Sequence, residues 1–288
     1  KVMKMKNVLD DSNETPKPSP QTLPVEVFAP WANIVVRFKI PDNIFANLLE
    51  LYEEINSSKW KSFGTQLVGQ IEDEPEVTPE LQDKYPLWTQ FCNDAARNFV
   101  MTQTQTVMQA EPKKWAEFLS DEVLTRVNTM WFVKQKPGEY NPVHIHTNCK
   151  VSAIAYVKTP KQQVKDRKAH YEADGRVTFM NNSGTDLNFS ASQCTFQPRV
   201  GDMYVFPALQ HHMVWPYRSA DPNDERVSIS FNADMITKSG LARKEKEQEE
   251  MMKYYEKEKQ KSENEKLNLN NEVKNDKSTD VSNINKSG

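Results

Sequence analysis

Two short clusters contain four of the five histidines in this sequence of 288 residues. His144 and His146 are separated by one residue, and His211 and His212 follow after a long stretch that is rich in turn residues. On an extended segment, side chains two residues apart point to the same side, so His144 and His146 can present both imidazoles to one point. A third imidazole from the distant pair can complete a metal site there.

Only one member of the second histidine pair is expected to take part. Adjacent residues of a strand face opposite sides, so His211 and His212 cannot both point into the same interior. Val214 has the same parity as His212 and is apolar. The pattern therefore favours His212 as the inward residue and His211 as the outward one.

Arg226 and Ser228 follow on a further predicted strand and share one of its faces. A guanidinium with a neighbouring hydroxyl can hold a carboxylate through several charge-assisted hydrogen bonds. The competing interpretation is an exposed salt bridge of Arg226 with Asp224 or Glu225. Three imidazoles beside a carboxylate clamp are typical of a non-haem Fe(II) centre that also holds a dicarboxylate.

Composition divides the chain into three predicted parts. Residues 1–21 are polar and carry three prolines, so we expect a disordered segment. Residues 22–237 are rich in aromatic side chains and can bury a core, so they are the predicted folded domain. Residues 238–288 hold few large apolar side chains; we predict a charged helix over 241–262 and a disordered tail after it.

Charge, hydropathy and cysteine content limit the classes of binding partner and the cellular compartment that we expect for this protein. A net charge of -3 gives no general electrostatic case for nucleic-acid binding. No apolar run approaches the length of about 18 residues that a membrane span needs. The three cysteines form no CxxC pair, which fits a reducing cytoplasm. The sequence leaves the oligomeric state open.

The spacing of apolar residues changes from helical to alternating near residue 126. Before it, the sequence predicts a strand over 34–39, a helix over 43–56 capped by Asp42, a helix from Pro79 past Val107, and a helical piece around 115–119. After it, the predicted strands lie at 128–136, 151–158, 176–180, 202–206, 211–215 and 226–232. This order predicts an α+β domain, mainly β, in which helices pack on one face of an antiparallel sandwich or barrel.

The chemical residues and their order together resemble the 2-oxoglutarate- and Fe(II)-dependent oxygenase superfamily. The similarity covers about 23–233 and is closest to the oxygenases of marine bacteria and tailed bacteriophages. It is carried by Pro142-x-His144-x-His146, Ser152, Tyr156, Gly201-Asp202, Phe206-Pro207, His212, Pro216-Tyr217, Arg226-x-Ser228 and Asn232. The resemblance implies a double-stranded β-helix, the cupin-like jelly roll, buttressed by N-terminal helices. If the protein is encoded by a phage, it also implies the host cytoplasm.

The resemblance also implies an activity and its cofactors. Fe(II) would be held by His144, His146 and His212, and the cosubstrate 2-oxoglutarate by Arg226 and Ser228 with Tyr156. Together with dioxygen they would support hydroxylation of a prime substrate, with release of succinate. That substrate is unidentified, and a protein side chain is one candidate class.

One position departs from the superfamily pattern. A carboxylate is expected two residues after His144, and this chain has His146 there. Three interpretations follow: all three histidines bind the metal; His144 and His212 bind it with water in the third place; or His146 and Asn148 form the near pair. Imidazole suits Fe(II) well and an amide oxygen only weakly, which ranks them in that order.

Two other classes of protein compete with the oxygenase. A cupin-like metal-binding protein would keep the jelly roll without oxidative turnover. A structural protein would use the domain as a scaffold for its charged C-terminal helix. Arg226 and Ser228 discriminate against the cupin, because a plain cupin needs no dicarboxylate clamp, and the clustered histidines argue against the scaffold.

Overall fold

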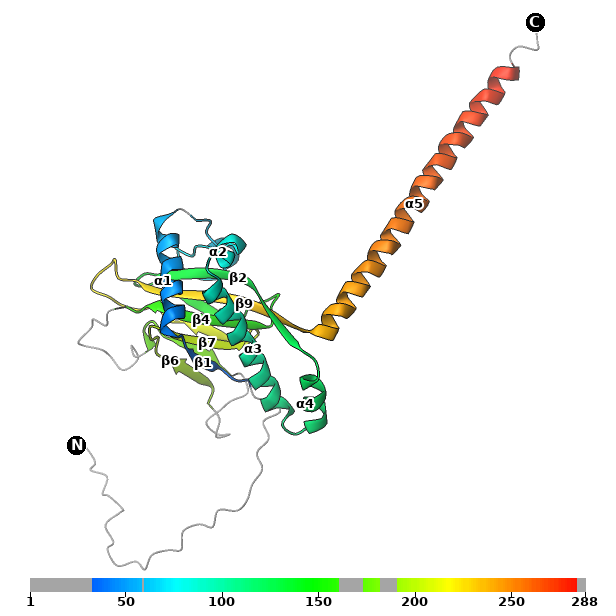
Figure 1. Cartoon of the computed structure of the whole chain (residues 1–288). Coiled ribbons are helices and arrows are strands. Elements are labelled where there is room, and N and C mark those ends of the chain that lie inside the picture. Colours follow the sequence, from blue (N-terminus) through cyan, green and yellow to red (C-terminus); the bar gives the residue numbers. More distant parts are fainter. Residues whose placement is uncertain (1–32, 59, 161–172, 182–190, 284–288) are drawn as a thin grey trace, which may run out of the picture.

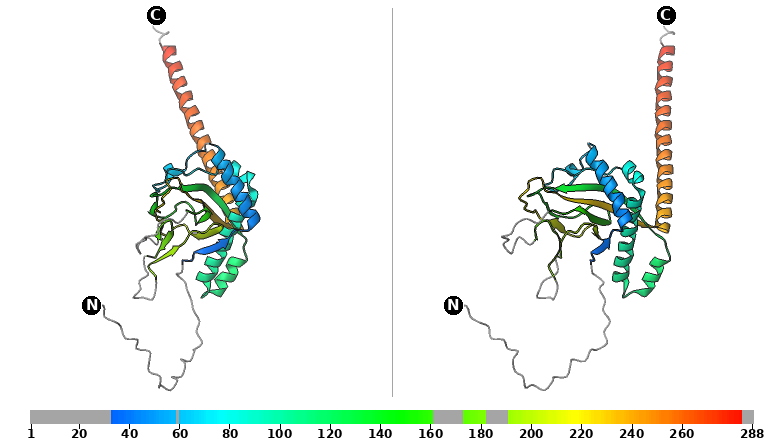
Figure 2. Two further views of the ribbon diagram at one scale, coloured as in Figure 1. Left: turned by 90° about the vertical axis from the view of Figure 1, so that its left-hand side faces the viewer. Right: turned by 60° about the vertical axis from the view of Figure 1, so that its left-hand side comes forward.

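Two antiparallel sheets form the body of the protein, with helices covering the outer face of the larger one (Figures 1 and 2). The computed structural model describes residues 33–58, 60–160, 173–181 and 191–283, and for residues 66 and 264–283 it describes the backbone alone. The first sheet has the order β1-β7-β4-β9-β2 and the second the order β3-β8-β5-β6. This arrangement confirms the predicted jelly roll with helices on one side.

The strands and helices follow the predicted order. The strands are β1 Val36–Lys39, β2 Val123–Gln135, β3 Asn141–His144, β4 Val151–Lys158, β5 Val177–Met180, β6 Gln193–Phe196, β7 Asp202–Pro207, β8 His212–Val214 and β9 Arg226–Thr237. The helices are α1 Asp42–Ser57, the 3-10 turn η1 Gly64–Gln66, α2 Pro79–Lys84, α3 Pro86–Met108, α4 Pro112–Leu119 and α5 Lys238–Asn283.

Strand β9 is buried on both faces and separates two interiors. Its residues Val227, Ile229 and Phe231 pack outward into the main core, which the buried faces of α1 and α3 complete. The alternate residues point into the space between the two sheets, and Arg226 and Ser228 are both fully buried there. The apolar side stabilises the helix layer, and the polar side is free to line a site.

Some predicted boundaries were wrong for identifiable reasons. The single helix expected from Pro79 past Val107 is broken at Tyr85, because Pro86 lacks an N–H and starts a new helix at its first position. Asp42 lies inside α1, and Pro41 stands at the N-cap. Strands β3 and β6 were not predicted; β3 contains Pro142, and β6 has only four residues and is mostly exposed.

Helix α5 projects away from the domain (Figure 1). It continues to Asn283, well beyond the predicted 241–262. Its first turn is held by the backbone N–H of Lys238, which donates to the carbonyl of Glu122 at 2.8 Å, and by Ser239, which bonds to Asp121. The division of the chain into 1–21, 22–237 and 238–288 stays a prediction.

The segment from Phe63 to Val77 closes one side of the space between the sheets. Bridges join it to β2 at Asp73↔Lys134 and Glu76↔Trp131. The ring of Phe63 stacks on that of Trp131 at a centroid distance of 5.1 Å. Glu74 lies inside this segment with 1% of its surface exposed, and its carboxylate oxygens have no hydrogen-bond partner among the described residues.

We predict that Glu74 makes the unfolding free energy depend on pH. Burial, with a smaller contribution from the charge of Glu139, raises the pKa of Glu74 to about 7. A carboxyl whose pKa is higher in the folded state favours folding at low pH. Stability should therefore fall as pH rises from the ordinary pKa near 4.5 to about 7. Glu74→Gln should stabilise the protein above pH 7 by on the order of 1–2 kcal/mol, after a discount for solvent screening.

Chemical denaturation between pH 4 and pH 8 would measure this effect. Glu72→Gln is the matched control, because Glu72 lies in the same segment but its side chain is 82% exposed. A Glu74→Gln variant that follows the pH dependence of the parent protein would contradict the prediction.

We also predict that residues 22–238 fold without either end. Among the described residues, the buried members of the main core lie between Ile40 and Ala233, and the partly buried ones packed on them lie between Ile34 and Met235. Removal of both ends therefore leaves this packing intact. Thermal unfolding of this shortened chain should be cooperative, with a midpoint near that of the full protein. Loss of cooperativity would show that one of the ends contributes to the fold.

Candidate metal centre and anion pocket

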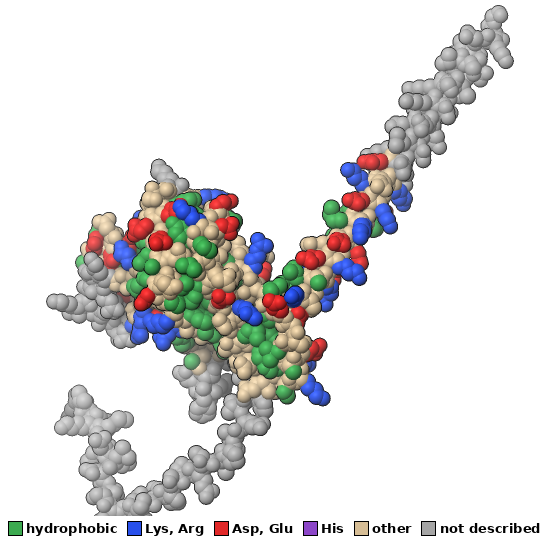
Figure 3. All heavy atoms as spheres, viewed as in Figure 1, with side chains coloured by type: hydrophobic (Ala, Val, Ile, Leu, Met, Phe, Trp, Pro, Cys, Tyr) green, Lys and Arg blue, Asp and Glu red, His purple; other side chains and the backbone are tan. Residues whose placement is uncertain are grey.

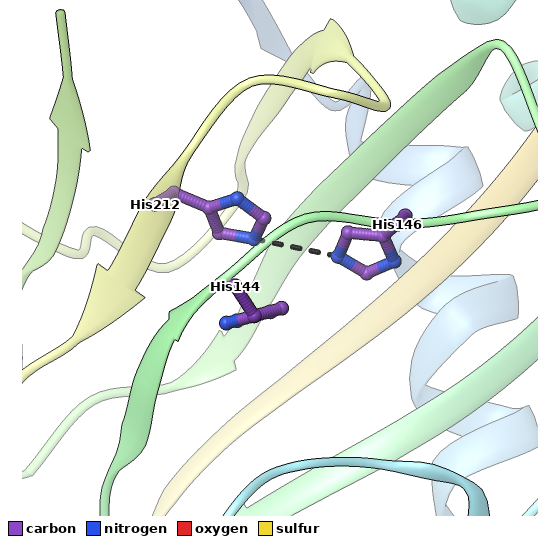
Figure 4. A group of neighbouring side chains, drawn as sticks. All are labelled: His144, His146 and His212. Carbon is purple, nitrogen blue, oxygen red and sulfur yellow. Dashed lines mark hydrogen bonds between the residues drawn. The ribbon is translucent and has the colours of Figure 1, made fainter. Parts of the chain in front are cut away.

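The structure brings His144, His146 and His212 together at one end of the space between the sheets (Figure 4). His144 ends β3 and is paired in register with His212, the first residue of β8. His146 follows on the segment that leaves β3 and points back toward the other two. One ring nitrogen from each lies within 4.8 Å of the others. This spacing allows three imidazoles to share one cation.

Backbone hydrogen bonds fix which nitrogen two of the imidazoles present. Nδ1 of His144 lies 2.7 Å from the carbonyl of Pro142, and Nδ1 of His212 lies 2.8 Å from the carbonyl of Gln210. A carbonyl only accepts, so each Nδ1 carries the proton and each Nε2 keeps its lone pair. Nε2 of His212 lies 3.3 Å from Nε2 of His146. The unprotonated Nε2 of His212 is thus turned toward His146.

Burial keeps these imidazoles neutral. It lowers the pKa of His144, lowers that of His146 to about 4, and lowers that of His212 well below its ordinary value. The neighbouring histidines lower the pKa of His146 and His212 further, and a hydrogen bond with Asn232 partly offsets this for His146. A neutral imidazole is the form that binds a metal ion.

The other candidates lie outside this cluster. His211 is exposed and His212 is buried, which is the orientation that strand parity predicts. Asn148 is exposed and has a left-handed backbone with φ 59°. Among the described residues, no Asp, Glu or Cys joins the three histidines within ligand distance.

A row of side chains leads from the histidines along the inner face of β9. Asn232 lies at the metal end and accepts a hydrogen bond from Ser152 at 3.0 Å. Ser230 lines the same cavity as the three histidines. Ser228 and Arg226 continue the row, and Tyr156 of β4 lies opposite Ser228 in register. The metal end and the buried arginine thus share one interior.

Arg226 has no surface exposed and no carboxylate partner among the described residues. Its Nη1 lies 3.2 Å from Oε1 of Gln135 and 3.4 Å from Oγ of Ser228. Its guanidinium carbon lies 5.0 Å from the centre of the Tyr156 ring. Nε and Nη2 of Arg226 and the hydroxyl of Tyr156 have no hydrogen-bond partner within the described part of the chain.

The exposed salt bridge considered for Arg226 is not formed. Glu225 pairs instead with Lys158 at 3.5 Å, and no contact between Arg226 and Asp224 is found in the described residues. A buried guanidinium that lacks an anion is costly, because neither water nor a carboxylate compensates its charge. The unpaired charge of Arg226 is therefore suited to a carboxylate from outside the protein.

Gln135 holds Arg226 in place and was not singled out in the sequence. It is fully buried, and its amide nitrogen donates to the carbonyls of Glu139 and Trp215, which leaves its Oε1 for Arg226. Gln135 and Arg226 face each other in the register of β2 and β9. The sequence offered one indication: Gln135 is spaced two residues from Val133 and four from Trp131, so on a strand it shares their face.

The space beside the histidines has two parts. An inner cavity of about 50 Å³ is lined by the three histidines together with Trp131 and Ser230. A larger groove of about 340 Å³ shares His144 and His146 with it and opens toward Asn128, Thr129 and Asn148. Leu67 and Val68 line both spaces. A small acid can lie inside while a second molecule approaches from the groove.

Comparison with known families agrees with this geometry. Residues 129–232 match the model of a family described as "Putative 2OG-Fe(II) oxygenase". The match covers less than half of the chain, yet it contains the three histidines, Tyr156, Arg226 and Ser228. No curated protein matches the sequence.

Solved structures show a distant likeness. A 2OG-Fe(II) oxygenase family oxidoreductase from Burkholderia pseudomallei is 11% identical, with 38% of this chain and 45% of that chain covered and a TM-score of 0.29. A prolyl-4-hydroxylase from Pseudomonas putida is 14% identical, with 69% of this chain and 92% of that chain covered and a TM-score of 0.41. The non-heme alpha-ketoglutarate-dependent epimerase SnoN is 12% identical, with 69% of this chain and 78% of that chain covered and a TM-score of 0.43. The family match supports the predicted class of enzyme: the middle of this chain is similar to the 2-oxoglutarate- and Fe(II)-dependent oxygenases.

Proposed function

We propose that the protein is an Fe(II)- and 2-oxoglutarate-dependent dioxygenase that hydroxylates a prime substrate at the histidine cluster. The observation that carries this proposal is the buried Arg226, whose Nε and Nη2 have no partner among the described residues. A metal-binding jelly roll without a dicarboxylate has no use for such a charge. The family match to residues 129–232 supports the same class.

The three histidines fit Fe(II) by donor chemistry. His144 and His212 present Nε2 because their Nδ1 atoms donate to backbone carbonyls. Neutral imidazole is a suitable ligand for Fe(II), and three of them leave further coordination positions open. We propose His144, His146 and His212 as the ligands, in preference to a water in place of His146 or to Asn148, which is exposed.

The donors around Arg226 suit the distal carboxylate of 2-oxoglutarate. The two unpartnered nitrogens of Arg226 can donate to the carboxylate oxygens, and the hydroxyls of Ser228 and Tyr156 can add further hydrogen bonds. Gln135 orients the guanidinium from behind. Charge neutralisation inside the domain makes this contact both strong and selective for an anion of the right length.

The chain's own residues position the reactants and exclude water. Trp131, Leu67 and Val68 cover the cavity, and Asn232 with Ser152 fixes the polar edge beside His146. When bound, Fe(II) and 2-oxoglutarate supply the oxidising chemistry with dioxygen. The protein's share is orientation of the C–H bond and a dry site.

The finer assignments are part of the same proposal. A phage or marine bacterial origin is supported by the sequence resemblance alone. A cytoplasmic location is supported by three cysteines that are all free. Among the described helices, none is both long and apolar enough to cross a membrane.

A cupin-like protein that binds metal without turnover is the second candidate. The observation that favours it is the histidine at position 146, where the superfamily pattern has a carboxylate. Release of succinate from 2-oxoglutarate by the Fe(II)-loaded protein separates the two: the dioxygenase releases it and the cupin-like protein does not.

We predict that metal affinity depends on His212 and not on its neighbour. His212→Ala should weaken Co(II) or Fe(II) binding more than about a hundredfold, since a lost ligand costs more than a lost supporting contact. His211→Ala should leave the affinity nearly unchanged, because that ring is exposed. Anaerobic calorimetric titration measures both, and equal losses would contradict the assignment.

The third ligand can be tested in the same titration. His146→Ala should weaken metal binding strongly, whereas Asn148→Ala should not. Loss of affinity in both variants would favour the shifted pair of His146 and Asn148. Loss at neither position would favour a water ligand beside His144 and His212.

We predict that Arg226→Ala weakens 2-oxoglutarate binding by about 2–5 kcal/mol, because the distal carboxylate would be left buried and unpaired. Metal affinity should survive, since Arg226 is not among the grouped ligand residues. Arg226→Lys should restore only part of the loss, because an ammonium does not reproduce the planar fork. Titration of 2-oxoglutarate into the metal-loaded protein is the measurement.

The matched control is Arg218→Ala, which removes an arginine that pairs with Asp174 outside the pocket. It should not change 2-oxoglutarate affinity. An unchanged affinity in Arg226→Ala would remove Arg226 from the site, and no binding to the parent protein would favour the cupin-like candidate.

A further inference from the structure

The inner face of the sandwich continues beyond the histidines on two strands alone. The pairing of β4 with β9 ends at Val151 and Ala233. From Asp234 to Thr237, β9 is therefore paired with β2 alone. Along this ribbon the facing pairs are Arg126↔Asp234 and Leu124↔Ile236. None of these four side chains is buried. The ribbon therefore forms an open wall that leads away from the metal centre.

Two hollows follow this wall. The groove of about 340 Å³ beside His144 and His146 reaches Asn128. A second hollow of about 500 Å³ also borders Asn128 and ends at the first turns of α5. Asn128 thus lies between a space next to the metal and a space at the base of α5.

The second hollow is apolar and basic. Its apolar side chains are Leu124, Ile236 and Leu241, since Met235 faces the helix side of the strand. Arg126, Lys150 and Lys244 stand around it, and none of the three has a side-chain hydrogen bond or ion pair in the part of the chain that the structure describes. The single carboxylate in the lining, Asp234, accepts a hydrogen bond from Asn128 at 2.9 Å. The hollow therefore carries an excess of positive charge.

Two nearby acidic residues are engaged by the start of α5. Figure 3 shows hydrophobic side chains together with both signs of charge where α5 leaves the domain. The acidic residues Asp121 and Glu122 bind the first residues of α5: Asp121 contacts Ser239, and Glu122 lies 3.4 Å from Lys238. They are not part of the lining of the hollow.

We propose that this ribbon is a docking groove for an extended peptide of the prime substrate, whose acidic and apolar residues occupy the hollow at the base of α5. This inference rests on the proposed dioxygenase function for the identity of the reacting residue at the histidines. From Asn232 to Ile236 an extended chain covers roughly 13 Å. The acidic residue would thus lie about four residues away from the reacting one.

A peptide fits this groove better than a nucleic acid does. Three apolar side chains form its wall, which suits leucine or isoleucine and offers nothing to a sugar-phosphate chain. A nucleic acid carries a phosphate at every nucleotide, so one phosphate would lie against the carboxylate of Asp234 and be repelled. A peptide can place its acidic residues only beside Arg126, Lys150 or Lys244. Polyuridylate serves below as the competing probe.

The test uses a library of random peptides of about ten residues, selected on the immobilised full-length protein. Asp or Glu combined with Leu or Ile should be enriched over the starting library. The double variant Arg126→Glu, Lys150→Glu should bind the selected peptides on the order of tenfold more weakly and should enrich Lys or Arg instead. Lys246→Glu with Lys253→Glu is the control, since it makes the same charge change on α5 outside the hollow.

The outcomes of this experiment test the docking groove independently of the proposed dioxygenase function. The charge-reversed variant should keep the metal and 2-oxoglutarate affinities of the parent protein, because neither residue lines the inner cavity. No acidic enrichment, equal weakening by the control variant, or displacement of the peptides by polyuridylate would overturn the groove. Failure of 2-oxoglutarate to bind, with acidic peptides still enriched, would overturn the dioxygenase and leave the groove standing.

Discussion

The alternation of side chains along β9 is the constraint on which the rest of the structure depends. Because successive residues of a strand face opposite sides, one strand serves both the helix-covered core and the polar interior. Val227, Ile229 and Phe231 bury apolar surface against the helices, which stabilises the layer that carries the strand. That stability is what allows the guanidinium of Arg226 to be held inside without a carboxylate partner among the described residues.

The site depends on this rigid frame at both ends. The pairing of β3 with β8 sets His144 opposite His212, and backbone carbonyls orient both rings. The pairing of β2 with β9 sets Gln135 opposite Arg226. Backbone register, more than any side-chain contact, therefore decides where the ligands and the anion pocket stand relative to each other.

Parity and spacing in the sequence were enough to predict an antiparallel sandwich or barrel with helices on one face, the inward orientation of His212 and the shared face of Arg226 and Ser228. The jelly roll itself was implied by the family resemblance. Parity and spacing failed where tertiary pairing overrides local pattern. Strand β3 contains a proline and exists because β8 pairs with it. Gln135 looks like any polar residue near a turn, and its role appears only when Arg226 is placed opposite. The break at Pro86 was readable from proline chemistry and was overlooked.

Asn128 is an extra residue in β2, since Val127 and Thr129 lie opposite the adjacent residues Ala233 and Asn232. Such a bulge exchanges the two faces of a strand for all residues beyond it. Without it, Val127 would turn from the helices toward solvent, and Arg126 would turn from solvent into the helix layer. One inserted residue thus lets a single strand build a closed interior and an open platform in succession, and relatives that lack the insertion would have to present a different surface at this edge.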